Sequence, residues 1–228
     1  MGISVSLLAP DAERLHEFLI ELTSIFSSIA YVSRVYTFGS MARGDWDRWS
    51  DIDLLVVTLA EGQFRTVWEA LHAARPVVHH HPFSAAEPSG AHALGNVFEG
   101  ESVFHCLDLN LMTQDDADAP GALARFGPLQ ELYRATSADP ADAIDHMPFL
   151  QELTPEEEAI SVNMHFTKKN VKRLLRGQDV RAEVQKHAAL LRTRMSRHLR
   201  DYRVAGGNIG YVAHTYLAIA DELLSESW

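Results

Sequence analysis

The chain has 228 residues, of which 46% are hydrophobic and 22% are charged, a composition typical of a folded globular protein and not of a disordered or fibrous one. Its formal net charge of −11 disfavours nucleic acid as a partner and favours a small cationic molecule over RNA or DNA as any second substrate, although the favoured interpretation of such a charge is solubility alone. The single cysteine, Cys106, excludes an intramolecular disulfide framework and a zinc site built from several cysteines.

No uninterrupted apolar run approaches the roughly 20 residues that a membrane span requires. The N-terminal residues 1–8 are weakly apolar, but they lack the basic region and the small-residue cleavage site of a signal peptide. Together with the lone cysteine, these features lead us to expect a cytoplasmic protein that has no membrane partner.

The first half of the chain alternates predicted helices and strands. Apolar residues at helical spacing, after Pro10-Asp11, predict a helix over residues 11–30. The sequence then predicts a strand over residues 31–38 and a second strand over 51–58, whose Leu-Leu-Val-Val run indicates burial on both faces. A helix over 64–74 and a short strand over 77–78 follow. Residues 82–100 read as a loop because they are rich in Pro, Ser, Gly and Ala.

A strand with clear alternation is predicted over residues 103–112, where every second residue falls on the same face. The Asp-, Ala- and Pro-rich stretch over 113–145 is the predicted domain connection. After it the pattern becomes helical throughout, and capping signals and glycine breaks predict helices over 154–176, 179–199 and 209–224. The sequence therefore predicts an α/β domain over 1–145 and an all-α domain over 146–228.

The segment that carries chemistry lies between the first two predicted strands. A strand that ends at Gly39-Ser40 and leads into a short helix would present backbone N–H groups at the helix N-terminus. Those groups and the Ser40 hydroxyl can hold a phosphate. Glycine at position 39 removes the Cβ that would keep a triphosphate at a distance.

Three carboxylates accompany this turn. Asp51 and Asp53 are two residues apart on a predicted strand, so both leave the same face. Two like charges side by side at the start of a buried strand are costly unless a cation lies between them, and Mg²⁺ is the expected one. Two such ions would suit in-line displacement at a phosphorus atom. Asp108 lies between two leucines on a strand of core residues, so its carboxylate should face a site.

This stretch resembles the nucleotidyltransferase superfamily that includes DNA polymerase beta. More narrowly, it is similar to the antibiotic nucleotidyltransferases, which modify aminoglycosides and lincosamides, and to the minimal prokaryotic nucleotidyltransferases. The residues that carry the resemblance are Gly39-Ser40-Met41-Ala42-Arg43-Gly44, Ser50-Asp51-Ile52-Asp53-Leu54 and Asp108. The resemblance implies a nucleotidyltransferase domain with a short mixed sheet, followed by a helical bundle that binds the substrate.

The resemblance also implies roles for the matching residues. Gly39, Ser40 and Arg43 would bind the nucleotide, although Arg43 could equally brace the loop. Asp51 and Asp53 would be catalytic ligands of Mg²⁺. The catalytic Asp108 matches a third carboxylate that is a general base in some relatives and a third metal ligand in others.

We therefore expect a Mg²⁺-dependent adenylyltransferase that transfers a nucleoside monophosphate, AMP from ATP or another nucleoside triphosphate, to a hydroxyl of a small molecule and releases pyrophosphate. An aminoglycoside-like acceptor is the first expectation and a lincosamide the second, with antibiotic resistance as the role. The protein would be a monomer or a homodimer. The alternatives are an antitoxin that AMPylates a toxin partner and a non-catalytic protein that retains the fold.

Two groups of basic side chains have competing interpretations. A solvated loop is the favoured interpretation of the histidines at 79–81, since their spacing matches no known metal site. The first helix of the second domain carries a basic stripe, for which a solvated face is favoured over contact with a triphosphate. That stripe consists of Lys168, Lys169, Lys172 and Arg173.

Two further pairs of residues have both a functional and a structural interpretation. Trp46 and Trp49 could stack on a nucleobase or pack against the protein. Arg192 and His198 have the spacing of RNases of the HEPN type, but the helix is rich in arginine and such a pair arises readily by chance.

Overall fold

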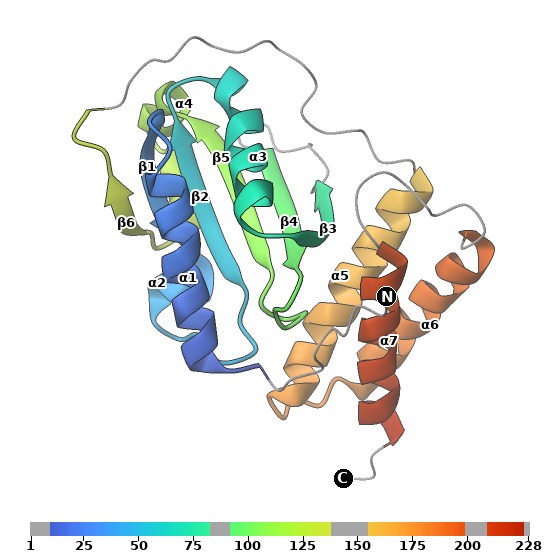
Figure 1. Ribbon diagram of the computed structural model, residues 1–228. Coiled ribbons are helices and arrows are strands. Elements are labelled where there is room, and N and C mark those ends of the chain that lie inside the picture. The colour runs from blue at the N-terminus through green and yellow to red at the C-terminus, as the bar shows by residue number, and fades with distance from the viewer. Residues whose placement is uncertain (1–9, 83–91, 138–154, 199–208, 226–228) are drawn as a thin grey trace. The chain divides into compact units, whose positions relative to one another are not determined.

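The computed structural model describes residues 10–82, 92–137, 155–198 and 209–225. The chain divides into two compact units, one formed by Met1–Val77 with His81–Gln151 and the other by Val78–His80 with Glu152–Trp228. The predicted fold class is confirmed: a mixed sheet with flanking helices is followed by helices alone (Figure 1). The predicted domain boundary between residues 145 and 146 lies outside the described residues.

The sheet has six strands in the order β3-β4-β5-β2-β1-β6. Strands β2 and β5 at its centre are parallel, whereas β1 pairs with both β2 and β6, and β4 with β5, in antiparallel fashion. The strands are β1 (Val32–Thr37), β2 (Ile52–Thr58), β3 (Val77–Pro82), β4 (His92–Phe98), β5 (Leu107–Thr113) and β6 (Gln130–Arg134).

One face of the sheet is covered by α1 (Ala12–Ser27) and α3 (Phe64–Ala74) (Figure 1). The Asp11 side chain begins α1 by accepting a hydrogen bond from the Glu13 backbone N–H at 3.0 Å. Buried residues at helical spacing then pack on the inward-facing side chains of the strands, as expected from their period. This core includes Leu15, Phe18, Leu22, Val35, Leu54, Val56, Val67, Leu71, Leu109 and Leu111.

The opposite face carries a smaller apolar cluster and the acidic residues. Its cluster contains Tyr36, Leu55, Val57, Met112 and Ala117. Because side chains alternate along a strand, Asp53 and Asp108 lie on the same face as Leu55 and Met112. The predicted burial of the 54–57 run on both faces is confirmed, since all four side chains are fully buried.

Several predictions about residues 79–145 are wrong. The predicted loop over 82–100 contains β4, and the predicted connection over 113–145 contains β6, α4 (Gln114–Asp118) and the short 3-10 helix η2 (Ala122–Phe126). The predicted strand over 103–112 begins only at Leu107, because the His105 backbone N–H turns back to the Ser102 carbonyl at 2.9 Å. The histidines at 79–81 lie in β3 and not in a loop, and the His79 side chain is buried.

The helices of the second unit are α5 (Pro155–Leu175), α6 (Arg181–His198) and α7 (Ile209–Ser225). The predicted apolar face of α6 is confirmed by the burial of Val180, Val184, Ala188, Leu191 and Met195. The predicted solvated basic stripe on α5 is wrong at Lys168 and Lys172, which are buried, whereas Lys169 is exposed. None of the helices in the described part of the chain is long and apolar enough to cross a membrane.

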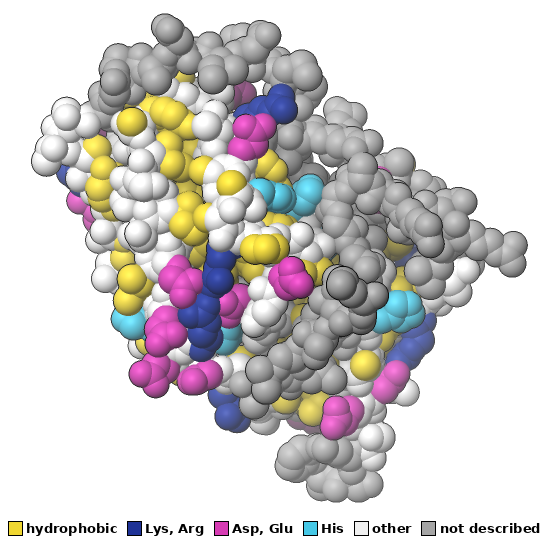
Figure 2. Space-filling view, viewed as in Figure 1, with side chains coloured by type: hydrophobic (Ala, Val, Ile, Leu, Met, Phe, Trp, Pro, Cys, Tyr) yellow, Lys and Arg dark blue, Asp and Glu magenta, His cyan; other side chains and the backbone are white. Residues whose placement is uncertain are grey.

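Two arginines hold the segment that precedes β5 against the helices. Glu101 is buried and accepts hydrogen bonds from Arg14 of α1 at 3.2 Å and from Arg75, at the end of α3, at 2.8 Å. Glu21 joins the network through both arginines. The hydrogen bond from Arg14 lowers the pKa of Glu21, so its contribution to stability is full above the usual carboxyl pKa and declines as the pH falls below it. Figure 2 shows basic side chains lying among acidic ones on one face of the molecule.

Replacement of Glu101 by glutamine should reduce the free energy of unfolding by about 2 kcal/mol, because two arginines lose the charge that compensates their partial burial. Glu69→Gln is the matched control, since Glu69 forms an exposed pair with Arg65 one helical turn away and should contribute less than about 0.5 kcal/mol. Urea denaturation of both variants measures the difference. Equal losses would contradict a structural role for the Glu101 network.

Candidate active site

The turn between β1 and the short helix α2 (Gly39–Arg43) places Gly39 directly beneath the Asp53 carboxylate. Gly39 has φ +65°, in the left-handed region that favours glycine. A Cβ built on Gly39 would lie 2.1 Å from Asp53 Oδ2 and 3.0 Å from Asp53 Cγ. The glycine is therefore needed for close approach as well as for backbone conformation, and the turn and the acid form one site.

The backbone of Asp53 is fixed from the end of β1. Its carbonyl oxygen accepts hydrogen bonds from Thr37 Oγ1 at 3.0 Å and from the Phe38 backbone N–H at 3.2 Å. Thr37 is buried, with 1% of its surface exposed, so its hydroxyl hydrogen bond is protected from water. The two bonds join the residue that precedes the Gly39 turn to the acidic strand.

We expect Thr37→Val to lower the turnover number about tenfold, because it keeps the shape of the side chain but removes one of the two bonds that hold Asp53. Thr58→Val is the matched control. Thr58 is also buried and donates to the Ala60 carbonyl at 2.9 Å, but it lies at the other end of β2. Steady-state kinetics of pyrophosphate release should separate the two variants, and equal losses would contradict a role for Thr37 in positioning Asp53.

Asp108 is the immediate neighbour of Asp53 across the two parallel strands. The register of β2 and β5 pairs Asp53 with Asp108, and the register of β4 and β5 pairs Gly95 with Asp108. Partners in register point to the same side of a sheet, so the two carboxylates lie together and have the smallest residue on their other flank. Asp51 immediately precedes β2, and the backbone N–H of Ile52 beside it donates to the Cys106 carbonyl at 2.9 Å.

The loop between α2 and β2 is held by its own polar groups. Asp47 accepts hydrogen bonds from the Trp49 backbone N–H at 2.9 Å and from the Ser50 hydroxyl at 3.2 Å. His105, which is buried, contacts the Arg48 carbonyl at 3.1 Å through Nε2 and joins this loop to the segment before β5. Asp51 therefore follows a loop that is held by its own turn and by the segment before β5.

The two tryptophans of this loop pack against the protein. Trp46 stacks on His16 with ring centroids 6.0 Å apart, and Trp49 meets the Phe104 ring edge to face at 5.3 Å. These contacts agree with the packing interpretation of the two tryptophans.

Arg43 and Ser40 lie on the short helix that begins at the turn. Ser40 is half-buried beside Gly39, whereas Arg43 is exposed and its guanidinium pairs with Asp45 at 3.1 Å. This pair is the loop-bracing arrangement that the sequence left open for Arg43. Contact of Arg43 or Ser40 with a phosphate remains a prediction.

The chemistry of the donor set suits a magnesium ion. Carboxylate oxygens are the ligands that Mg²⁺ prefers, and this ion commonly takes one or two carboxylates and completes its shell with substrate phosphates and water. Asp53 and Asp108 provide two adjacent carboxylates, with Asp51 two residues before Asp53. Within the residues that the structure describes, no group of three or more His, Cys, Asp or Glu side chains forms a ready-made metal site.

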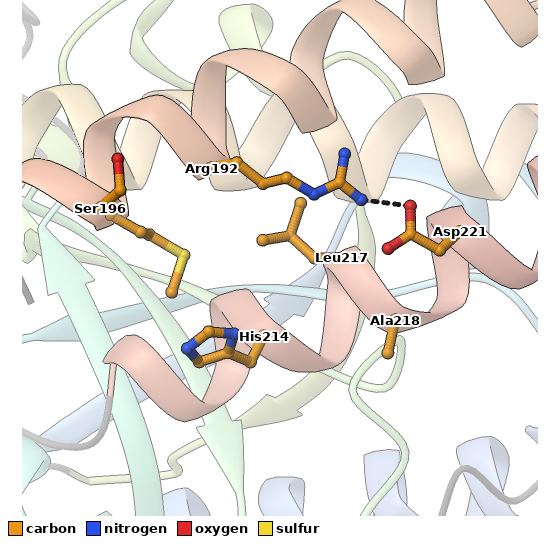
Figure 3. A pocket seen from close by; sticks show the side chains of 7 residues that line it. Arg192, Ser196, His214, Leu217, Ala218 and Asp221 are labelled. Atoms are coloured by element: carbon orange, nitrogen blue, oxygen red, sulfur yellow. Dashed lines mark hydrogen bonds and ion pairs between the residues drawn. The ribbon is translucent and has the colours of Figure 1, made fainter.

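The helical unit has a hollow of about 430 Å³ between α6 and α7 (Figure 3). Met195, Leu217 and Ala218 provide its apolar wall, and polar side chains, among them His214 and Ser196, lie around it. The Arg192 guanidinium forms an ion pair with Asp221 across the two helices. Arg192 thus has a structural partner, and the side chain of His198 lies outside the described residues.

Sequence reasoning missed Thr37, His105 and Gly95 as supports of the site. Thr37 and Gly95 act through the pairing of strands that are distant in sequence, and β4 was not predicted at all. His105 carried a signal, since a histidine at an inward-facing position of a core segment needs a polar partner. Its partner, the Arg48 carbonyl, lies 57 residues away in sequence.

Comparison with known proteins gives a family for the segment that carries this site. Residues 19–79 match the family model described as the nucleotidyltransferase domain. This match includes the Gly39 turn, Asp51 and Asp53, and ends before Asp108. No curated protein matches the chain in sequence.

Three solved structures resemble the chain at low sequence identity. An aminoglycoside 6-adenyltransferase from Bacillus subtilis is 12% identical, with 92% of this chain and 91% of that chain covered and a TM-score of 0.35. The GLD-2/RNP-8 complex is 12% identical, with 91% and 78% covered and a TM-score of 0.35. A candidate nucleotidyltransferase from Sulfolobus solfataricus is 18% identical, with 55% and 82% covered and a TM-score of 0.29. At scores this low, the family assignment depends on the motif-bearing segment and not on these structures.

Proposed function

We propose that this chain, which carries a nucleotidyltransferase domain, transfers a nucleoside monophosphate from a nucleoside triphosphate, ATP first, to a hydroxyl group of a small molecule. The observation that carries the proposal is the register pair Asp53 and Asp108, with Asp53 placed directly over Gly39. Nucleotidyl transfer requires a turn that binds the phosphates and two adjacent carboxylates held on rigid strands.

Each residue of the site has a proposed role. Gly39 and Ser40 bind the triphosphate at the start of α2, with Arg43 able to reach it if the Asp45 pair opens. Asp53 and Asp108, with Asp51, hold Mg²⁺, which when bound would offset the negative charge of the phosphate oxygens. Asp108 serves in both roles, as a ligand of the ion and as the base for the acceptor hydroxyl.

The proposed chemistry is a single displacement at the α-phosphorus. The acceptor hydroxyl oxygen forms a bond to this phosphorus, the bond to the β-phosphate oxygen breaks, and pyrophosphate leaves with the electron pair. Asp108 accepts the proton of the attacking hydroxyl. Because the two acids are neighbours on the sheet, the proton acceptor lies beside the residue that positions the phosphates.

The charge of the chain supports a cationic acceptor. The formal net charge is −11, and a negative field favours the approach of cations. An aminoglycoside-like molecule, which carries both amino groups and hydroxyls, is therefore the first proposed acceptor, and a lincosamide is the second. Antibiotic resistance would be the corresponding role.

A pyrophosphate-release screen tests this proposal. ATP and GTP are each incubated with Mg²⁺ and a panel of aminoglycosides and lincosamides, with wild-type protein and Asp108→Asn in parallel. We expect release with at least one acceptor and a loss of about 10³-fold or more in the variant. Failure of every small acceptor, together with labelling of a protein by ATP, would replace the small acceptor by a protein one.

A further inference from the structure

The helical unit has an exposed apolar patch on the surface formed by α5 and α6. Val162 and Phe166 on α5 are 46% and 40% exposed, and Leu190 on α6 is 41% exposed. The Phe166 ring stacks on His187 with centroids 5.1 Å apart, and Leu190 lies almost one turn further along α6. These residues therefore form one continuous patch, which we call the α5–α6 face.

Exposed charges continue this face along each helix, with opposite signs at the two ends. A helix advances about 100° per residue, so Glu158 and Lys169 lie on the same side of α5 as Val162. By the same spacing Glu183 and Arg194 lie on the same side of α6 as Leu190. All four charged residues are exposed. In the described part of the chain, none of the four forms an ion pair.

The exposed apolar and charged side chains of α5 are complementary to those of a second α5 that runs in the opposite direction. The position midway between Val162 and Phe166 also lies close to the midpoint of Glu158 and Lys169, which are about 9 and 8 Å away along the axis. A second α5 that lies antiparallel across this point places Val162 against Phe166 and Glu158 against Lys169. Each contact then occurs twice, as a two-fold axis requires.

The same axis also suits α6. The contact between Phe166 and His187 fixes the level of one helix against the other. Since α5 and α6 are joined by a short connection and run antiparallel, the midpoint of α5 lies at the level of residues 188–189. That level is the midpoint of Glu183 and Arg194. One two-fold axis thus pairs Glu158 with Lys169 and Glu183 with Arg194. The exposed Lys186, which also lies on the Leu190 side of α6, is close to this axis and has no opposite charge across it among the described residues.

We propose that the α5–α6 face binds the same face of a second copy of this chain, with α5 antiparallel to α5 of the partner. An exposed apolar centre with a charged rim is the usual composition of an interface between proteins. Unpaired charges arranged to match their own reverse favour a copy of this chain over an unrelated partner, because a two-fold interface must be self-complementary.

Charge reversal tests the axis directly. Sedimentation velocity of the full chain over a concentration series should show dimers. Lys169→Glu should raise the dimer dissociation constant about tenfold or more, since it creates two like-charge contacts with Glu158 in each dimer. Glu158→Lys should do the same. The double variant Glu158→Lys/Lys169→Glu should return the constant to within about threefold of wild type.

Substitution of the apolar centre is the second arm. Phe166→Glu should abolish dimers, whereas Ile20→Glu, at a residue 57% exposed on α1 of the other unit, should leave them unchanged. A chain that stays monomeric at every concentration overturns the proposal. Dimers that persist in Phe166→Glu would contradict the α5–α6 face as the interface. A double charge variant whose dimer dissociation constant is as high as that of the single variants would contradict the antiparallel arrangement. If Phe166→Glu does not fold, the charge variants decide.

Discussion

Asp53→Asn should reduce the turnover number for pyrophosphate release by at least about 10³-fold, equivalent to about 4 kcal/mol of transition-state stabilisation. Asparagine keeps the size of the side chain and can still contact a hydrogen-bond donor, but it removes the charge that a magnesium ion requires. Because the Asp53 main chain is held by Thr37 and Phe38, the fold should tolerate the change. The measurement is steady-state pyrophosphate release with the acceptor that the screen identifies.

Asp115→Asn is the matched control for this substitution. Asp115 is exposed in the first turn of α4, which follows the C-terminal end of β5, whereas Asp108 lies near the N-terminal end of that strand. It should therefore have the wild-type turnover number. Full activity in Asp53→Asn would contradict the assignment of this residue, and an equal loss in the control would indicate a general effect of reduced negative charge.

Gly39→Ala should reduce the turnover number by about 10²-fold or more while the protein remains folded. The new methyl group would meet Asp53 Oδ2 at 2.1 Å. The atom that it meets is the far end of a side chain, so the carboxylate can rotate away. The expected result is a displaced Asp53 carboxylate in a folded protein.

Gly44→Ala separates this clash from backbone strain. Gly44 also has a positive φ, of +75°, but a Cβ at this position would meet nothing within 4 Å. Both variants should therefore lose about 1 kcal/mol of stability, because alanine is disfavoured in the left-handed region. Only Gly39→Ala should lose activity. Turnover numbers and thermal unfolding are measured for both variants. Equal turnover numbers in the two would contradict the role of Gly39 in positioning Asp53.

The strands that carry Asp53 and Asp108, and the face on which each residue lies, could be predicted because they depend on local sequence patterns. The Leu-Leu-Val-Val run after Asp53 indicated a strand buried on both faces, and the alternation around Asp108 placed that residue opposite the leucines. What no local pattern contains is the pairing of Asp53 with Asp108. It arises from two parallel strands that lie 55 residues apart in the chain.

Strands β4 and β6 were missed because their side chains carry little strand signal. Strand β4 contains His92, Gly95 and Asn96, and β6 is a short polar edge strand whose side chains are mostly exposed. Both are stabilised by backbone pairing to neighbours that the sequence does not reveal. The opposite error occurred before β5, where residues 103–106 are buried as in a strand but form a turn.

Burial of polar residues was also difficult to anticipate. Lys168, Lys172 and His79 are buried although their residue types are usually exposed or intermediate. A sequence shows which side of a helix or strand a residue occupies, but the depth of its burial depends on neighbours from other elements. Arg43 shows the reverse case, since its exposed pair with Asp45 is formed by a residue two positions away.

Binding of a non-hydrolysable ATP analogue, measured by isothermal titration calorimetry with and without Mg²⁺, tests the central claim without knowledge of the acceptor. If Asp53 and Asp108 form a metal and triphosphate site, the wild-type affinity should rise at least about tenfold with Mg²⁺, and this gain should disappear in Asp53→Asn. An affinity that is the same with and without Mg²⁺, or a gain that survives in Asp53→Asn, would contradict the account.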